Sequence, residues 1–306
     1  MKIGIPKGLL NYKYYIFFST FFEQLGAEIV TSGDTDIKIL NEGIKYCVDE
    51  ACLPIKVFHG HASSLRNKCD FLFIPRIMQL GEREFICPKF CGLPEMIKNN
   101  IPELPPIISS AIYAYDFKKM LEFAIEASRP ITKDKKKIKK ALLKALDKQD
   151  SCKTGICQQE YVMRIGLIGH PYNIYDTFVN MNITEKLNKL GVGAITEENV
   201  YEADKDKHVQ KLFKRPFWNF ARNSYGSAVH LAKEKIVDGI IYISSFACGI
   251  DSVVLELIKN DIGEFPLLVI KIDEHTGEAG LNTRIEAFID MLERRKYCES
   301  NLSTLG

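Results

Sequence analysis

The chain has 306 residues, with 41 Lys and Arg against 39 Asp and Glu, so its formal net charge at pH 7 is only +2. Hydrophobic residues make up 46% and charged residues 26%, the composition of an ordinary soluble globular protein, which excludes collagen-like and disordered chains. The low net charge gives no reason to expect a nucleic acid as partner, and no apolar run approaches the ~20 residues of a membrane helix. Because Lys7 interrupts the first residues before a signal-peptide core can develop, we expect a cytoplasmic protein.

The predicted elements occur twice in the same order. In the first half, an apolar face of Phe17, Phe18, Phe21, Phe22 and Leu25 predicts a helix, and short apolar runs predict strands at 2–6, 25–30, 70–75 and 104–109. In the second half, Val179, Ile183, Leu187 and Leu190 predict the corresponding helix, and strands are expected at 164–169, 190–195, 238–244 and 265–270. This alternation of strands and helices predicts an α/β fold with parallel sheets covered by helices on both faces.

We therefore expect two tandem α/β domains, at residues 1–128 and 161–306. Residues 129–160 between them contain a lysine-rich stretch with Ile138, Leu142, Ala145 and Leu146 on one side, and then a loop with two cysteines. The pattern predicts an amphipathic connecting helix with a solvated basic face. A docking face for an acidic electron donor is the alternative.

The nine cysteines need a chemical explanation, since a reducing compartment argues against disulfides. In doubly wound sheets, ligands bind beyond the carboxyl ends of the strands. Cys248 follows the strand expected at 238–244, and Cys87 and Cys91 lie on the corresponding loop of the first half. Cys52 precedes a helix start marked by Pro54, where backbone N–H groups favour a thiolate. We expect these four thiols to meet in a cleft between the domains.

Three explanations remain open for these thiols: a zinc site, inert buried cysteines, or an iron–sulfur cluster. The only close pair is C-x3-C, whereas structural zinc sites usually carry C-x2-C pairs. His59 and His61 do not share a helix face, and His170 could pack, cap or contact a ligand. The chain has neither a phosphate-binding G-x-x-x-x-G-K-[ST] loop nor a G-x-G-x-x-G pattern, so no nucleotide site is indicated.

The chain resembles the 2-hydroxyacyl-CoA dehydratase and activase-related family, which includes the double-cubane cluster proteins. The resemblance covers nearly the whole chain and rests on CLPIKVFHGH (52–61), IPRIMQLGEREFICPKFCGLPEMI (74–97), KTGIC (153–157), IGHPYNIYD (168–176), SSFACGIDS (244–252) and DEHTGEAGLNTRIEAFIDML (273–292). It implies two flavodoxin-like or Rossmann-like domains with an oxygen-sensitive cluster in the cleft, either [4Fe-4S] or double-cubane [8Fe-9S]. It also implies electron delivery by a separate ATP-hydrolysing activase, and it leaves room for a small-molecule substrate and a homodimer.

Within that resemblance the candidate ligands fall into three groups. Cys52, Cys87, Cys91 and Cys248 lie inside the matching motifs and come first, Cys157 is second, and Cys47 and Cys152 are third. Cys69 opens a core strand and Cys298 lies in a polar tail, so both are set aside. We expect an iron–sulfur reductase component driven by the activase. The alternatives are a 2-hydroxyacyl-CoA dehydratase subunit and a non-catalytic cluster carrier or redox sensor.

Overall fold

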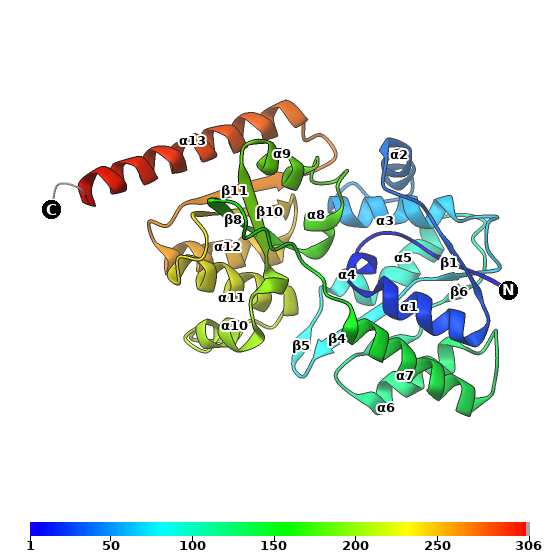
Figure 1. The fold of residues 1–306 in the computed structure, drawn as a ribbon. Helices are drawn as coiled ribbons and strands as arrows, with labels where there is room; N and C mark the ends of the chain where they lie inside the picture. Colours follow the sequence, from blue (N-terminus) through cyan, green and yellow to red (C-terminus); the bar gives the residue numbers. More distant parts are fainter. Residues whose placement is uncertain (304–306) are drawn as a thin grey trace. The chain divides into compact units, whose positions relative to one another are not determined.

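The structure is a computed structural model that describes residues 1–303, and the chain divides into two compact units (Figure 1). The first unit consists of Met1–Thr154 together with Pro216–Phe220. The second unit consists of Gly155–Arg215 and the chain from Ala221 onward. Each unit is built around its own parallel sheet, as the α/β pattern of the sequence predicts.

The two main sheets have the same strand order. In the first unit, a four-stranded sheet has the order β2-β1-β3-β6, formed by β1 (Lys2–Ile5), β2 (Glu28–Thr31), β3 (Phe71–Phe73) and β6 (Ile107–Ile108). In the second unit, the order is β9-β8-β10-β11, formed by β8 (Met163–Gly169), β9 (Val192–Thr196), β10 (Gly239–Ser245) and β11 (Leu267–Ile272). Every neighbouring pair is parallel, so the repeat seen in the sequence is a repeat of topology.

An aspartate joins the first and third strands in the same way in both units. The backbone N–H of Lys2 donates to Asp70 Oδ2 at 2.7 Å, and the N–H of Asp70 donates back to the Lys2 carbonyl at 2.9 Å. In the second unit, the N–H of Arg164 donates to Asp238 Oδ2 at 2.8 Å, and the N–H of Asp238 donates to the Arg164 carbonyl at 2.8 Å. The correspondence therefore extends from strand order to individual hydrogen bonds.

The first unit has helices α1 to α7 and a second, small sheet that the sequence pattern did not predict. The helices are α1 (Asn11–Leu25), α2 (Ile37–Lys45), α3 (Leu53–Ser64), α4 (Pro88–Cys91), α5 (Leu93–Asn100), α6 (Phe117–Ala127) and α7 (Lys135–Ser151). The small sheet has the order β5-β4-β7, from β4 (Arg76–Gly81), β5 (Glu84–Phe85) and β7 (Ala111–Tyr113). An aromatic core holds α1 on the main sheet, since the rings of Phe18 and Phe73 have centroids 4.8 Å apart.

The lysine-rich helix α7 is amphipathic, as expected, and it packs along α1 within the first unit. Its apolar side buries Ile138, Ala141, Leu142 and Ala145. Near its end, Gln149 Nε2 donates to the Lys13 carbonyl at 3.0 Å. The helix is thus part of the first unit's packing, and most of its lysines remain exposed.

In the second unit, helices cover both faces of the sheet. They are α8 (Pro171–Tyr175), α9 (Ile183–Lys189), the short 3-10 helix η1 (Glu197–Asn199), α10 (Glu202–Val209), α11 (Asn219–Lys233), α12 (Gly249–Ile262) and α13 (Glu278–Ser303). A side chain at Gly239 would meet Phe288 of α13, whereas one at Gly166 would meet Leu231 of α11. Since Gly239 pairs with Ile165, the neighbour of Gly166, the two glycines point to opposite faces of the sheet.

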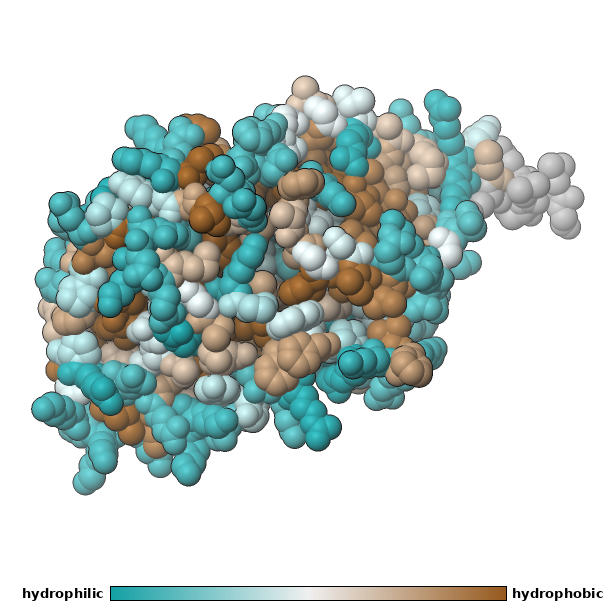
Figure 2. Space-filling view, turned by 180° about the vertical axis from the view of Figure 1, so that it is seen from behind, coloured by the Kyte–Doolittle hydropathy of each residue, from teal (hydrophilic) through white to brown (hydrophobic). Residues whose placement is uncertain are grey.

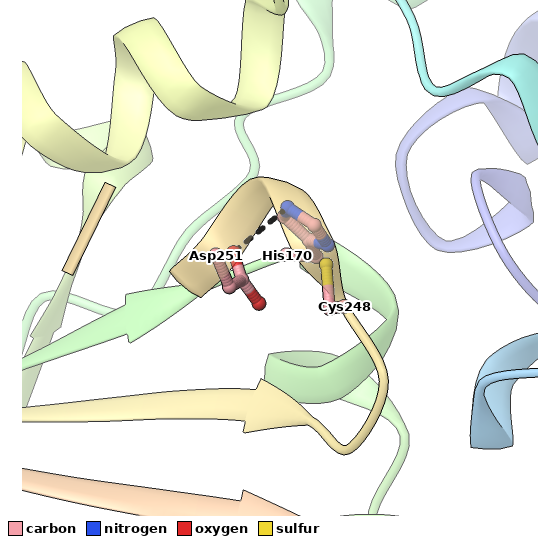
Figure 3. A group of neighbouring side chains, drawn as sticks. All are labelled: His170, Cys248 and Asp251. Carbon is pink, nitrogen blue, oxygen red and sulfur yellow. Dashed lines mark ion pairs between the residues drawn. The ribbon is translucent and has the colours of Figure 1, made fainter. Parts of the chain in front are cut away.

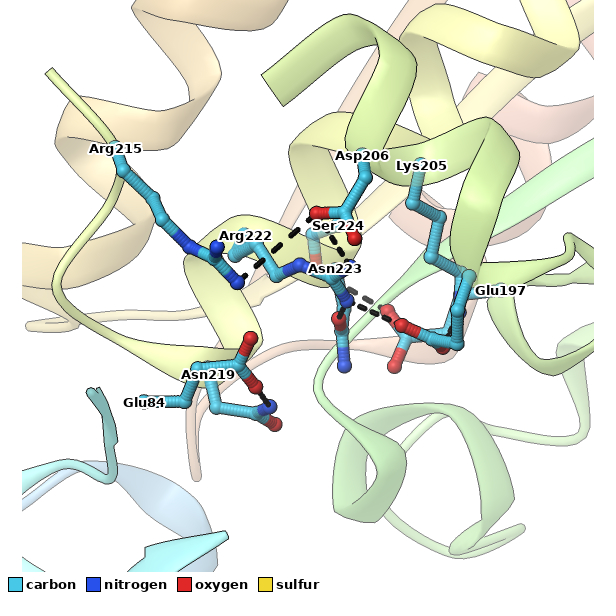
Figure 4. Close-up of polar contacts among 10 residues, drawn as sticks. Glu84, Glu197, Lys205, Asp206, Arg215, Asn219, Arg222, Asn223 and Ser224 are labelled. Carbon is cyan, nitrogen blue, oxygen red and sulfur yellow. Dashed lines mark hydrogen bonds and ion pairs between the residues drawn. The ribbon is translucent and has the colours of Figure 1, made fainter. Parts of the chain in front are cut away.

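A buried arginine connects α10 to α11. Arg222 is only 3% exposed, and its guanidinium pairs with Glu202. It also pairs with Asp206 at 2.8 Å (Figure 4). Such a charge is stable inside a protein only when it is paired in this way.

The surface view in Figure 2 shows hydrophilic side chains over much of the face, with hydrophobic residues scattered among them. Among the residues that the structure describes, no helix combines the length and the apolar character needed to cross a membrane.

Candidate functional site

Cys52 stands at the start of α3, as the proline signal predicts. It is the N-cap residue of the helix, Pro54 lies in the first turn, and the Cys52 side chain makes no capping hydrogen bond. Its thiol therefore stays available beside the N-terminal end of a helix whose dipole favours negative charge.

The position of α3 is fixed by a close crossing with α2. A Cβ atom added at Gly43 would lie 1.9 Å from the Lys56 carbonyl oxygen, and one added at Gly60 would lie 1.8 Å from the Ile39 carbonyl oxygen. Only glycine allows the two backbones to approach so closely. The crossing thus holds α3, and with it Cys52, at one place in the unit.

Cys87 and Cys91 stand at the two ends of α4, which follows the β4–β5 hairpin. Cys87 is the N-cap residue, and the Cys91 sulfur lies 3.3 Å from the sulfur of Met78 on β4. Arg76 of β4 donates to the Cys91 carbonyl at 2.8 Å and also pairs with Glu95 of α5. The hydrogen bond from Arg76 lowers the pKa of the Glu95 carboxyl, so this ion pair holds α5 and the end of α4 against the small sheet.

Lys89 of α4 brings the two cysteine segments together. Its Nζ lies 3.4 Å from Cys52 Sγ, so Cys52 is placed beside the short helix that Cys87 and Cys91 delimit. Cys52, Cys87 and Cys91 are all partly buried. The structure therefore places Cys52 beside Lys89 of α4, within the unit that also holds Cys87 and Cys91.

Cys47 lies in the same region but is held as a thiol. Burial raises its pKa to about 11, and a nearby Cys52 thiolate would raise it further, while Lys56 and Lys89 act in the opposite direction. Cys47 is thus near the site yet protonated at neutral pH.

The spacing of these sulfurs bears on the kind of metal they could hold. In the described part of the chain, Cys52, Cys87 and Cys91 do not belong to any set of three ligands whose donor atoms all lie within 4.8 Å of one another. A single zinc ion needs its ligands that close, whereas a cluster binds each thiolate through a different iron. Thiolates are soft donors that suit both zinc and iron–sulfur clusters.

Cys248 is placed at the carboxyl edge of the second unit's sheet, as predicted. It follows β10 and caps α12, and its sulfur lies close to His170 and Asp251 (Figure 3). His170 follows the neighbouring strand β8, and its Nε2 lies 3.3 Å from Asp251 Oδ1. The donor atoms of these three residues all lie within 4.8 Å of one another.

Two tyrosines complete this buried group. The Tyr172 hydroxyl lies 2.6 Å from His170 Nδ1, and the Tyr242 hydroxyl donates to Asp251 Oδ1 at 2.8 Å. Burial raises the pKa of Tyr242 well above its usual value, so this tyrosine remains a hydrogen-bond donor. Sequence reasoning found Cys248 and His170 from their places after strands. It missed Asp251 and Tyr242, although Asp251 lies in the first turn of α12 in the same motif.

The remaining cysteines occupy other surroundings. Cys157 is exposed, in a segment that pairs with β9 through Ile195 of the second unit. Cys152 is exposed after α7, and Cys298 is exposed on α13. Cys69 packs against β1, since a side chain at Gly4 would lie 2.6 Å from its sulfur.

His59 and His61 are both buried within the first unit and engaged in hydrogen bonds. His59 Nδ1 lies 2.8 Å from the Ile55 carbonyl oxygen. His61 lies 2.8 Å from Ser32 Oγ and 2.9 Å from Thr35 Oγ1. Both rings therefore have structural partners.

Comparison with known families gives two matches. The model of the CoA enzyme activase uncharacterised domain matches residues 2–200, and that of the 2-hydroxyglutaryl-CoA dehydratase D-component matches residues 109–292. The first match contains Cys52, Cys87 and Cys91, and the second contains Cys248. The chain matches none of the curated proteins.

Proposed function

The chain belongs to the 2-hydroxyacyl-CoA dehydratase and activase-related family, and on that premise we propose that it is an iron–sulfur reductase component that receives low-potential electrons from an ATP-hydrolysing activase. The observation that carries this proposal is the meeting of Cys52 with α4, which carries Cys87 and Cys91 at its ends. When bound, a cluster would supply one-electron transfer at low potential.

The chain's own residues suit such a group in two ways. Three thiols provide soft donors. Lys89 Nζ, 3.4 Å from Cys52 Sγ, provides positive charge beside one of them. Arg76 holds the Cys91 carbonyl at 2.8 Å and so fixes the end of α4. We infer that Cys52, Cys87 and Cys91 are ligands and that Lys89 stabilises the negative charge that thiolates bring.

Cys248 is proposed as a further ligand because it stands at the carboxyl edge of a parallel sheet, and Cys157 is proposed next. His170 is held on one side by Tyr172 and on the other by Asp251, so its ring has a fixed orientation near Cys248.

A second candidate function is that of a 2-hydroxyacyl-CoA dehydratase subunit, which the dehydratase D-component match over residues 109–292 favours. The two functions are separated by adding CoA esters to the anaerobic protein. A CoA-dependent change in the visible spectrum supports the dehydratase function, whereas reduction by an activase with ATP and no response to CoA esters supports the reductase function. A protein that is reduced but turns over no substrate is an electron carrier.

The proposal is tested by iron and sulfide analysis of protein purified without oxygen. We expect a brown protein with at least four irons per chain, as a [4Fe-4S] cluster requires. Cys52→Ser, Cys87→Ser and Cys91→Ser should each lose most of the iron. Cys69→Ser and Cys298→Ser, which change cysteines outside the site, should keep it. A colourless protein with one zinc per chain, or Cys52→Ser protein with full iron content, would contradict the proposal.

A further inference from the structure

Two histidines and a glutamate that belong to none of the cysteine segments come together where α10 and α11 meet. His208 lies in the last turn of α10, His230 lies in α11, and Glu234 follows that helix directly. The N–H of Glu234 donates to the His230 carbonyl at 3.0 Å, so the helical turn continues and the two side chains share one face. The donor atoms of His208, His230 and Glu234 all lie within 4.8 Å of one another.

Three ring nitrogens of the two imidazoles are buried without a hydrogen-bond partner among the described residues. His208 is only 2% exposed, and among the described residues neither of its ring nitrogens has a hydrogen-bond partner. His230 Nδ1 is also buried, and it has no hydrogen-bond partner among the described residues. Buried ring nitrogens are normally satisfied, and here they lie beside each other, with ring centroids 5.7 Å apart.

The surroundings of the two rings suit metal ligands. His230 Nε2 lies 4.0 Å from Asp204 Oδ2, so a carboxylate faces this ring nitrogen while Nδ1 stays available for a metal. Burial lowers the pKa of His208, and Lys211, His230, Lys233 and Lys207 lower it further. His208 is therefore neutral at pH 7, and the neutral imidazole is the form that binds metals.

We propose that His208, His230 and Glu234 bind one divalent transition-metal ion, for which zinc is the best fit. Two imidazoles and one carboxylate are a donor set of zinc and its first-row neighbours, whereas magnesium and calcium prefer oxygen donors alone. Three protein ligands leave one position of a tetrahedral ion for water.

The metal joins α10 to α11 at a second point. Arg222 of α11 already pairs with Glu202 at the start of α10 and with Asp206 past its middle. Figure 4 shows Asp206 beside Arg222. His208, in the last turn of α10, lies beside His230 of α11 and Glu234, which follows that helix. With the metal bound, both ends of α10 are tied to the same helix, and α10 is expected to resist local opening.

The test uses zinc and the whole protein, kept anaerobic so that any cluster remains. Zinc bound per chain is measured by equilibrium dialysis and metal analysis for wild type, His230→Gln and Glu234→Gln, with His275→Gln as the control for loss of an exposed histidine. Thiols also bind zinc, but they contribute equally to all four proteins. We expect His230→Gln to bind one zinc fewer, Glu234→Gln to bind that zinc at least tenfold more weakly, and His275→Gln to match wild type.

Thermal unfolding supplies an independent readout. Micromolar zinc should raise the Tm of wild type and of His275→Gln but not that of His230→Gln, because a ligand that binds only the folded form stabilises it. Glu234 is exposed, so Glu234→Gln remains folded even if changes at the buried histidines impair folding. Iron content should be the same in all four proteins, which separates this site from the cysteine site. Equal zinc content and affinity in wild type, His230→Gln and Glu234→Gln overturn the proposal.

Discussion

The ammonium group of Lys89 lies 3.4 Å from the sulfur of Cys52, although 37 residues separate them in the chain. Lys89 lies on α4, the short helix that Cys87 and Cys91 delimit, so its positive charge is placed beside the Cys52 thiol. A fixed positive charge beside thiolate ligands favours the more negative, reduced state of whatever they hold.

Lys89→Met should therefore make the proposed cluster harder to reduce. Loss of one positive charge at this distance is expected to lower the midpoint potential by roughly tens of millivolts. The measurement is a redox titration followed by electron paramagnetic resonance. Lys98→Met, which removes an exposed lysine from the neighbouring helix α5, is the matched control and should leave the potential unchanged. An unaltered potential in Lys89→Met would show that this lysine does not act on the cluster.

Gly60→Ala should destabilise the first unit. The added methyl group would lie 1.8 Å from the Ile39 carbonyl oxygen, so α2 and α3 must separate, at a cost of about 1–3 kcal/mol in the free energy of unfolding. Urea unfolding followed by circular dichroism measures the change. Gly277→Ala, where a methyl group meets open space, is the control. If Gly60→Ala is as stable as wild type, the close crossing of α2 and α3 is wrong.

The buried His61 should make the protein less stable in mild acid. Burial, with a smaller effect of Lys7, lowers its pKa to about 4, whereas an unfolded chain takes up this proton near pH 6.5. Between these two values the unfolded state binds more protons, so stability is full above pH 6.5 and falls as the pH drops toward 4. From pH 7 to pH 5 the loss attributable to His61 is about 2 kcal/mol.

The measurement is urea unfolding at both pH values for wild type and His61→Gln. The glutamine variant is less stable overall, because it disturbs the contacts with Ser32 and Thr35, but its stability should change less between pH 7 and pH 5. His275→Gln should retain the wild-type pH dependence, since that side chain is exposed. Equal pH dependence in wild type and His61→Gln would refute the assignment.

Cys248→Ser tests whether the second unit supplies a cluster ligand. Serine has nearly the same volume but a hydroxyl that ionises poorly, so we expect a loss or conversion of the cluster with little change in the cores of the units. Iron content, the visible spectrum and hydrogen exchange are measured together, and Cys298→Ser is the control. Full iron content in Cys248→Ser would restrict the ligands to other cysteines.

The sequence predicted the features that depend on local pattern. The main strands, the end of α1 at Gly26 and the places of Cys52 and Cys248 at helix starts all follow from apolar runs and from glycine or proline signals. The predicted ends of strands were less accurate. The strand expected at 104–109 covers only Ile107–Ile108 in the structure, because two prolines precede these residues.

Features that depend on distant contacts could not be read from the sequence. The small sheet of β4, β5 and β7 is covered by Phe217, whose ring stacks on Phe85 at 4.3 Å and whose carbonyl accepts from the Phe85 N–H. Asn219 likewise donates to Glu84 at 2.7 Å. These partners are more than a hundred residues apart in the chain. The local spacing of apolar residues carries no information about contacts between such distant segments. His208 and His230 also lack a known ligand spacing and become neighbours only through the packing of α10 on α11.

The hydrogen bond from Lys2 to Asp70 is equivalent to the one from Arg164 to Asp238, and this equivalence indicates how the two halves arose. Two sheets with the same strand order and the same aspartate pairing are most simply the products of a tandem gene duplication. Cys52, Cys87 and Cys91 then belong to one descendant copy, and Cys248 with its histidine and aspartate neighbours belongs to the other. The two halves kept a common scaffold and diverged in the chemistry that each carries at its loops.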